Sequence, residues 1–389
     1  MITHCILVHY HEIAIKGKNR KWFESIFENN LKKQLLPLPF ECITSSSARL
    51  YIFGVDPNRW DEYSNRLKCV MGLANATLMV QINAELDKIK TSAENFIAKK
   101  IFSNFRISAR RQYKNYPMTS NEINVEVGSH IQNICNKPVK LKNADVNIYI
   151  EIVKGMAYLG TERIHGFGGL PVGVSETGVS LLSSGIDSPV ASFEMLKRGM
   201  NLTYIHFHSA PATSRQSIKN VEELLLILSK YQMKCMVHFT PLLDIQKKIM
   251  ADVQEKYWVL LFRRAMVKLA SMVANNIHAP VLITGESVGQ VASQTISNIS
   301  VVSAASKGPI LRPLAGHNKE DIINRAKQIG TYDKSVEPYQ DCCSFFVPLH
   351  PETKANHQRI TEMEDKLDLN HLLEDAVQNS ELKIIKYSE

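Results

Sequence analysis

Apolar and polar positions along the chain switch between the period of strands and the period of helices. Residues 5–10 form an apolar run typical of a strand, and residues 20–36 place their apolar side chains on one face of a helix. The alternation up to residue 161 predicts two small α+β units, with strands within 41–53, a helix at 60–70, a strand at 77–82, a helix at 86–101, a strand at 105–109, a helix at 121–136, and strands at 146–153 and 157–161.

A glycine- and proline-rich stretch at 166–173 interrupts this pattern, and we place a domain boundary there. Beyond it, strands and helices alternate, with strands at 179–182, 202–207, 235–239 and 281–284, a long helix near 245–275 and a helix at 319–329. This order predicts an α/β domain built on a doubly wound parallel sheet. Such sheets bind ligands at the carboxyl ends of their strands.

Length and composition indicate a folded protein of more than one domain. A chain of 389 residues with 44% hydrophobic residues predicts two or three domains with proper cores. No apolar run is long enough to cross a bilayer, and the first residues carry no secretory pattern. Seven cysteines, an odd number, favour free thiols in a reducing compartment. We therefore expect a cytoplasmic protein with no membrane partner.

The positive charge is concentrated in the first part of the chain. The formal net charge is +8, and residues 1–170 hold 23 Lys and Arg against 15 Asp and Glu. Residues 171–389 hold 23 against 23, so the whole excess precedes the α/β domain. A basic front half joined to a neutral half suggests a module that binds a phosphate backbone and presents it to an active site. The alternative is a solvated lysine-rich surface.

The sequence Ser-Ser-Gly-Ile-Asp-Ser at 183–188 joins an apolar strand to a helix. Free backbone N–H groups at the start of such a helix suit a phosphate, Gly185 allows close approach, and the Asp187 carboxylate suits Mg²⁺. The loop is neither a Walker A loop nor a dinucleotide fingerprint, because both glycine patterns are missing. It resembles the Ser-Gly-Gly-x-Asp-Ser loop of enzymes that cleave ATP to AMP and pyrophosphate, with Ser184 in place of the first glycine. The alternative is a serine-rich turn in which Asp187 only caps the helix.

Polar residues follow other strands of the predicted sheet. His206 ends the second strand, Arg263 lies on the long helix, and Lys319 opens a later helix. The segment 284–295 follows a strand with glycines, hydroxyls and amides, which are groups that hydrogen-bond a nucleotide. Each has an ordinary structural explanation, but together at the strand ends of one domain they indicate a binding site.

The chain resembles the bacterial tRNA 4-thiouridine synthetases (the ThiI family) over essentially its whole length. The resemblance rests on the segments 12–20, 110–111, 119–124, 163–173, 183–190, 284–295 and 337–343. It implies an N-terminal ferredoxin-like domain at 1–57, a THUMP RNA-binding domain at 58–165 and a PP-loop ATP pyrophosphatase domain at 172–389. The implied reaction is adenylation of the C4 oxygen of uridine 8 in tRNA, followed by displacement of AMP by sulfur, with ATP and Mg²⁺ as cofactors.

The resemblance also implies roles for individual residues. The catalytic group comprises Asp187, Lys319 and a sulfur-handling cysteine, which is Cys342 by counting from Lys319 and Cys343 by spacing to Pro351. The ATP contacts fall on Leu181, Leu182, Ser183, Ser184, Gly185, Asp187, Ser188, His206, Phe207, Arg263, Gly285 and Gln294. We expect the RNA contacts at basic residues of the front half, namely Lys16, Lys18, Arg20, Arg110, Arg111 and Lys114.

Cysteine chemistry gives an independent reason to consider the adjacent pair Cys342 and Cys343. A thiolate carries a persulfide sulfur, or releases it by forming a disulfide. No Cys-x-x-Cys occurs, which argues against a zinc ribbon or an iron–sulfur cluster, and we expect no bound metal besides Mg²⁺. Many relatives append a rhodanese domain that carries the persulfide. Here we expect sulfur to come directly from a cysteine desulfurase, and a second role in thiamine synthesis is doubtful.

Other interpretations remain open at this point. The chain could be another PP-loop tRNA-modifying enzyme, although such enzymes lack the THUMP-like front half. It could also be a non-catalytic tRNA-binding relative whose loop has decayed at Ser184, since serine resists a positive φ at a cost of about 1 kcal/mol. Relatives act as dimers, and we carry a homodimer over as an expectation.

Overall fold

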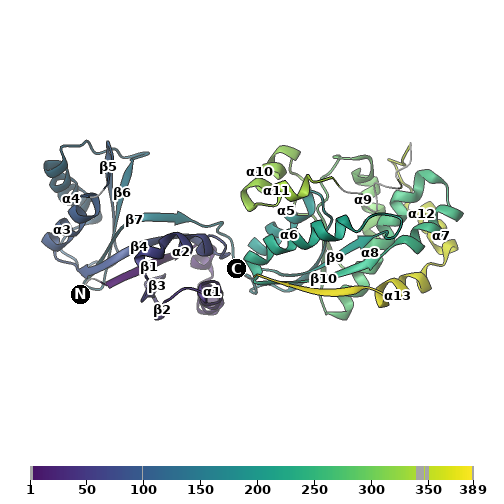
Figure 1. Ribbon diagram of the computed structural model, residues 1–389, viewed down its shortest axis with the longest axis horizontal. Helices are drawn as coiled ribbons and strands as arrows, with labels where there is room; N and C mark the ends of the chain where they lie inside the picture. Colours follow the sequence, from purple (N-terminus) through teal and green to yellow (C-terminus); the bar gives the residue numbers. More distant parts are fainter. Residues whose placement is uncertain (1–2, 99, 339–345, 347–349, 388–389) are drawn as a thin grey trace. The chain divides into compact units, whose positions relative to one another are not determined.

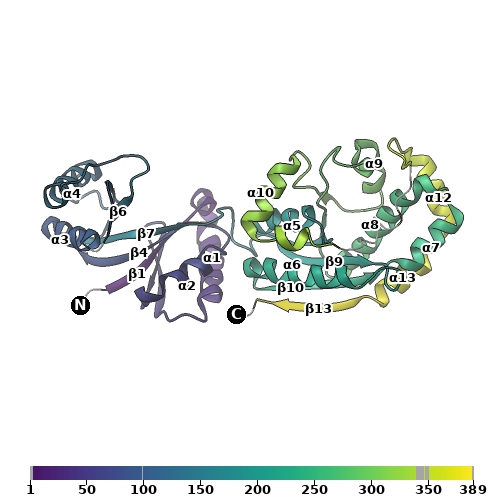
Figure 2. The same ribbon diagram turned by 45° about the horizontal axis from the view of Figure 1, so that its top comes forward.

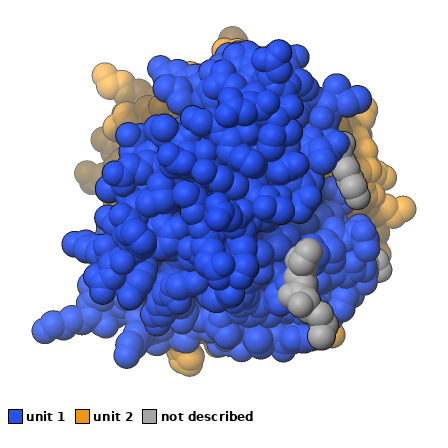
Figure 3. All heavy atoms as spheres, turned by 90° about the vertical axis from the view of Figure 1, so that its left-hand side faces the viewer, with its two compact units in different colours: residues 1–171 blue, residues 172–389 orange. Residues whose placement is uncertain are grey.

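The computed structural model describes residues 3–98, 100–338, 346 and 350–387. The chain divides into two compact units, residues 1–171 and 172–389, which Figure 3 colours separately. None of the helices in these described ranges is long and apolar enough to cross a membrane.

The first unit is a seven-stranded sheet in the order β2-β3-β1-β4-β7-β6-β5 (Figure 1). Only β5 and β6 pair in parallel. The strands are β1 Thr3–Tyr10, β2 Cys42–Ser46, β3 Arg49–Phe53, β4 Leu73–Asn83, β5 Phe105–Arg111, β6 Val146–Val153 and β7 Met156–His165. The helices are α1 Arg20–Leu35, α2 Trp60–Leu67, α3 Leu86–Ile97 and α4 Ser120–Cys135.

Two large apolar cores and a smaller cluster around Leu7 and Met79 lie on this one sheet. The apolar faces of α1 and α2 pack with β1, β2 and β3 in the first core, and those of α3 and α4 pack with β5 and β6 in the second. The long strands β4 and β7 pair with each other and join the two halves. The two α+β units expected from the sequence therefore share one continuous sheet.

The second unit is a six-stranded sheet in the order β12-β11-β8-β9-β10-β13. Its strands are β8 Thr177–Leu181, β9 Asn201–His208, β10 Lys234–Pro241, β11 Val281–Ile283, β12 Ile310–Leu311 and β13 Glu381–Lys386. The first five run parallel, as expected of a doubly wound domain. The last strand, β13, pairs antiparallel with β10 at one edge and was not predicted.

Helices cover both faces of this sheet. Figure 2 shows α5, α6 and α10 together, apart from a group made of α7, α8, α12 and α13. The apolar side chains of that second group form one core with Val179, Ile205 and Phe207 of the sheet. The helices are α5 Asp187–Lys197, α6 Gln216–Gln232, α7 Leu243–Asp252, α8 Trp258–Asn276, α9 Ile296–Ser303, α10 Lys319–Ile329, α11 Tyr332–Ser335, α12 His357–Leu367 and α13 Asn370–Gln378.

The single long helix expected near 245–275 is wrong, because the structure has two helices there, α7 and α8. The break begins at Val253, whose backbone is extended and whose carbonyl accepts a hydrogen bond from Trp258 Nε1 at 2.9 Å. The apolar period runs through the break because both helices bury residues in the same core. A hydrophobic pattern alone does not reveal such a change of direction.

Candidate active site

The polar strand ends meet where the strand order reverses. From the central strand β8 the chain proceeds to β9 on one side, and it later returns to β11 on the other side. Ligands of open parallel sheets bind in the crevice at such a switch point. The loops after β8 and β11 touch there, because a Cβ added to Gly285 would lie 2.7 Å from the Ser188 backbone nitrogen. Gly285 therefore has no room for a side chain.

Hydroxyl groups close the loop between β8 and α5. Ser183 N–H donates to Ser188 Oγ at 2.9 Å, and Ser188 Oγ donates back to the Ser183 carbonyl at 3.1 Å. Gly185 N–H donates to Ser183 Oγ at 3.3 Å. These bonds hold the turn in shape while α5 begins at Asp187. The first N–H groups of a helix have no partner within the helix, which suits an anion.

Ser184 is accommodated without backbone strain. Residues with positive φ in the described ranges do not include Ser184, so the cost expected for a serine in a left-handed turn does not arise. Its side chain is fully buried, and Ser184 Oγ has no hydrogen-bond partner among the described residues. The turn tolerates serine in place of glycine and leaves one polar atom unpaired.

Both oxygens of the Asp187 carboxylate are engaged. Lys319 Nζ lies 2.6 Å from Asp187 Oδ1, and Gln290 Nε2 donates to Asp187 Oδ2 at 2.8 Å. Asp187 does not cap its own helix, since Ile186 is the N-cap and makes no side-chain cap bond. Lys319 and Gln290 approach together because the loop after β11 is tied to the segment before α10, through Val288 N–H to Ala315 O at 3.1 Å and Ser287 Oγ to His317 O at 2.8 Å.

His206 supports the start of the loop between β8 and α5. Its side chain is buried, and Nδ1 lies 2.8 Å from the Leu182 carbonyl. Burial lowers the pKa of His206 to about 4, and the bond to the carbonyl opposes this only in part. The ring is therefore neutral at pH 7. Its proton is on Nδ1, which donates a hydrogen bond to the Leu182 carbonyl. Phe207 is buried beside it.

Arg263 belongs to a cluster around the buried carboxylate of Glu286. Glu286 pairs with Arg263 and with Arg312, whose Nε lies 2.6 Å from Glu286 Oε2. Thr284 Oγ1 donates to the same oxygen at 2.8 Å. Burial acts to raise the pKa of Glu286, but the two guanidinium groups outweigh it and the pKa is lowered. Sequence reasoning missed Glu286 and Arg312, because neither lies in a periodic pattern.

Gln290 and Gln294 each present an unpaired oxygen. The backbone of Gln294 closes the loop after β11, accepting from Gly289 N–H at 2.9 Å and donating to Val291 O at 2.8 Å. Gln290 Oε1 and Gln294 Oε1 are buried and have no hydrogen-bond partner within the described part of the chain. A buried oxygen without a hydrogen-bond partner destabilises the fold. Such atoms are typical of a binding site in which the ligand supplies the missing donors. The sequence placed both residues in the candidate segment 284–295 but assigned an individual role only to Gln294.

The predicted RNA contacts fall into two groups on the first unit. Lys16 and Lys18 lie in the short turns that precede α1, and Arg20 opens α1, where its Nε pairs with Glu24 at 2.9 Å. Arg110 and Arg111 end β5, the far edge strand of the same sheet, and Arg111 donates to the carbonyl of Lys114 at 3.1 Å. The structure therefore brings together the members of each group but leaves the groups on different elements.

A polar cavity of about 340 Å³ lies beside the second group. Arg163 reaches it from β7, with its guanidinium carbon 3.5 Å from the centre of the Tyr149 ring. Burial lowers the pKa of Arg163, although Tyr149 and Glu151 oppose this. The sequence did not single out this cavity, whose lining includes Arg106, Arg110, Asn124, Asn147, Tyr149, Glu151 and Arg163.

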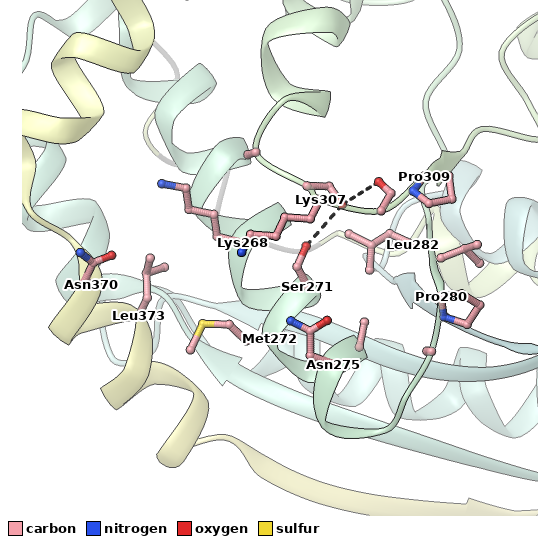
Figure 4. A pocket seen from close by; sticks show the side chains of 16 residues that line it. Lys268, Ser271, Met272, Asn275, Pro280, Leu282, Lys307, Pro309, Asn370 and Leu373 are labelled. Carbon is pink, nitrogen blue, oxygen red and sulfur yellow. Dashed lines mark hydrogen bonds between the residues drawn. The ribbon is translucent and has the colours of Figure 1, made fainter.

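Other candidates lie away from the switch point or outside the described residues. Cys342 and Cys343 are outside the described residues. Over the described ranges, no group of three or more His, Cys, Asp or Glu could hold a metal ion. A cavity of about 410 Å³ between α8, α13 and the entries to β11 and β12 contains none of the predicted site residues (Figure 4).

Comparison with known proteins gives matches over most of the chain. The family model described as "Thiamine biosynthesis protein (ThiI)" matches residues 173–369, the ThiI ferredoxin-like domain matches 5–77 and the THUMP domain matches 83–162. A 4-thiouridine synthetase solved as an RNA complex with bound ATP is 31% identical, with a TM-score of 0.87, over 99% of this chain and 100% of that chain. PH1313 from Pyrococcus horikoshii Ot3 is 25% identical, with a TM-score of 0.63, over 84% of this chain and 99% of that one.

Proposed function

This chain belongs to the ThiI family, and we propose that it is an ATP-dependent tRNA sulfurtransferase that converts uridine 8 of tRNA to 4-thiouridine. It contains the ferredoxin-like, THUMP and PP-loop parts of that family. The boundaries 1–57, 58–165 and 172–389 are our proposed division of these parts. A cytoplasmic location is proposed with them.

One observation carries the proposal. The Asp187 carboxylate lies at the switch point of the parallel sheet, at the start of a helix, with the Lys319 ammonium 2.6 Å away. Free helix N–H groups, a carboxylate and an ammonium in one place suit a nucleoside triphosphate that loses pyrophosphate. Lys319 would stabilise the negative charge that develops on the leaving pyrophosphate.

The residues present fit ATP. Gly285 lets the loop after β11 lie directly against the backbone of Asp187 and Ser188, and three buried polar atoms, Ser184 Oγ, Gln290 Oε1 and Gln294 Oε1, have no partner in the described ranges. We assign phosphate contacts to the loop 182–188 and further nucleotide contacts to Arg263, Gly285 and Gln294. His206 and Phe207 would hold the strand end on which the nucleotide rests.

The residues also fit a magnesium ion that arrives with the nucleotide. Mg²⁺ in such enzymes takes one or two carboxylates and completes its shell with phosphates and water. Asp187 offers one carboxylate, and Ser183 and Ser188 place hydroxyls in the same turn. When bound, the ion would neutralise phosphate charge.

We propose that Cys342 or Cys343 handles the sulfur received from a cysteine desulfurase. On one side of the pair, Ser335 lies against the site, since Ser335 Oγ donates to the Gly185 carbonyl at 3.3 Å. On the other side, Phe346 packs against Phe262 in the core of the same unit, with the ring centres 6.3 Å apart. The terminal sulfur of a persulfide on one cysteine would attack C4 and displace AMP. The other thiolate would then form a disulfide and leave the sulfur on the base.

We propose that the basic residues of the first unit bind the tRNA backbone and that the active form is a homodimer. Lys16, Lys18 and Arg20 form one contact group, and Arg110, Arg111 and Lys114 form the other. The decayed-loop alternative gains nothing from Ser184, since that residue has no positive φ. Transfer of sulfur to the thiamine pathway is a secondary proposal that rests on the family alone.

The test is to supply the chain with unmodified tRNA transcript, ATP, Mg²⁺, cysteine and a cysteine desulfurase, and to quantify 4-thiouridine by mass spectrometry. We expect 4-thiouridine from the normal transcript and none from a transcript with cytidine at position 8. The variant Asp187→Asn should make none. Absence of product from the unaltered chain, or modification at another position, would contradict the proposal.

A further inference from the structure

Arg263 is held in one orientation by groups outside its own helix. Its guanidinium pairs with Glu286 and also donates to the Ser293 carbonyl at 3.0 Å. The side chain is 17% exposed, so it is not closed off from solvent where it meets the loop after β11. A long flexible side chain fixed in this way loses little further freedom when it binds a ligand.

Glu286 is fully engaged by three elements. One carboxylate oxygen faces Arg263 on α8, and the other accepts from Arg312 and from Thr284. Thr284 follows β11, and its N–H donates to the carbonyl of Leu311 at the end of β12 at 3.1 Å. Arg312 is held in turn by Ser303 Oγ of α9 at 2.8 Å. The carboxylate therefore joins the carboxyl ends of two strands to two helices.

The neighbours of Glu286 link this cluster to the phosphate loop. Gly285, the preceding residue, lies against the backbone of Asp187 and Ser188, with a built Cβ at 2.7 to 2.8 Å from their atoms. A displacement of Glu286 would shift Gly285 into that backbone. A purely stabilising ion pair needs no such position, and buried ion pairs are often replaceable without loss of stability.

We propose that Glu286, together with Arg312, is a positioning residue that orients Arg263 toward the nucleotide. This inference rests on the proposed binding of ATP by Arg263. Arg312 keeps Glu286 in place by occupying its second oxygen, so that Arg263 has a fixed partner on the first.

The test compares the dissociation constant for ATP, by equilibrium dialysis, in the variants Glu286→Gln, Arg263→Met and the double variant. Glu286→Gln removes the charge and keeps the shape. We expect each single variant to bind ATP about tenfold more weakly, the effect of losing a charged hydrogen bond. The double variant should be no weaker than Arg263→Met, because both changes remove the same contact. In each variant, KM for ATP should rise by about the same factor as the dissociation constant, while kcat changes less.

Glu364→Gln is the matched control, because Glu364 is a buried glutamate that pairs with Arg264, the next residue of α8. It should leave the dissociation constant unchanged. Additive effects in the double variant, or normal ATP binding by Glu286→Gln, would overturn the inference while leaving the proposed function intact. If Arg263→Met binds ATP normally, both the inference and the assignment of Arg263 are wrong. If the unaltered chain does not bind ATP, the proposed function fails.

If Glu286→Gln does not fold, Thr284→Val keeps the inference testable. It removes only the hydroxyl that donates to Glu286 at 2.8 Å. We expect a smaller loss, about threefold in the dissociation constant for ATP, in line with one hydrogen bond to a charged group that keeps its other partners. Unchanged ATP binding in this variant would overturn the inference.

Discussion

Two adjacent arginines on α8 show how location decides what an ion pair does. Arg263 and Arg264 each pair with a buried glutamate, Glu286 and Glu364 respectively. Arg264 is 4% exposed, and its cluster joins α8 to α12 and to the Val301 carbonyl of α9 at 2.6 Å. Arg263 is 17% exposed and lies at the switch point.

The two clusters also differ in how fully their atoms are paired. Both oxygens of Glu286 accept hydrogen bonds, whereas Glu364 Oε1 and Arg264 Nε have no hydrogen-bond partner in the described part of the chain. The Arg264–Glu364 cluster in the core therefore leaves some of its polar atoms unpaired, whereas both carboxylate oxygens of the Glu286 cluster are paired. The same chemistry serves packing in one case and orientation of a side chain at a binding site in the other.

The largest effect on stability is expected from Arg264→Met. This change leaves the Glu364 carboxylate buried with Lys268, at 2.9 Å, as its remaining partner among the described residues. Removing one member of a buried pair costs about 3 kcal/mol or more. Urea unfolding should show this loss, and folded protein should retain its affinity for ATP. A loss of ATP affinity in the folded state would remove the distinction between the two arginines.

A smaller effect, present at neutral pH and vanishing in acid, is expected from Glu364→Gln. Burial acts to raise the pKa of Glu364, but Arg264 and Lys268 outweigh it, and the pKa lies below the ordinary 4.5. The stability from this charge is present above about pH 4.5 and is lost as the pH falls through the lowered pKa. The free energy of unfolding, measured with urea, should therefore fall less steeply between pH 6 and pH 3 in the variant than in the unaltered chain. Parallel curves for both proteins would show that the charge contributes nothing.

The smallest effect on stability is expected from Arg263→Met. Glu286 keeps Arg312 and Thr284 as partners, so no buried charge is left alone. We expect a loss of about 1 kcal/mol or less in the free energy of unfolding, the value of one hydrogen bond at a partly exposed group. A loss as large as that of Arg264→Met would mean that the Glu286 cluster is mainly structural.

The sequence predicted the parts of this site that lie in regular elements. The loop 182–188 follows β8, His206 lies in β9, and the helix that Lys319 opens has the predicted bounds. These residues stand beside strong apolar runs, which fix the ends of strands and helices from local sequence. The ferredoxin-like, THUMP and PP-loop parts were also predicted and are confirmed by the family matches.

Long-range pairing could not be predicted in the same way. Gln290 contacts Asp187 across 103 residues, and Glu286 gathers Arg263 and Arg312 from two other elements. Gln290, Glu286 and Arg312 lie in loops, where polar residues carry no period. Local sequence therefore does not distinguish their side chains from solvated ones. The strand β13 was missed for a related reason, since its residues are largely exposed and give no alternating pattern.

The central claim is that the switch-point site activates tRNA with ATP, and tRNA-dependent exchange of pyrophosphate into ATP tests it most directly. The unaltered chain and Glu364→Gln should both catalyse exchange that requires tRNA. Asp187→Asn should reduce the exchange rate by about a thousandfold, a loss of about 4 kcal/mol in transition-state stabilisation. Exchange by Asp187→Asn at the normal rate, or none by the unaltered chain, would contradict the account.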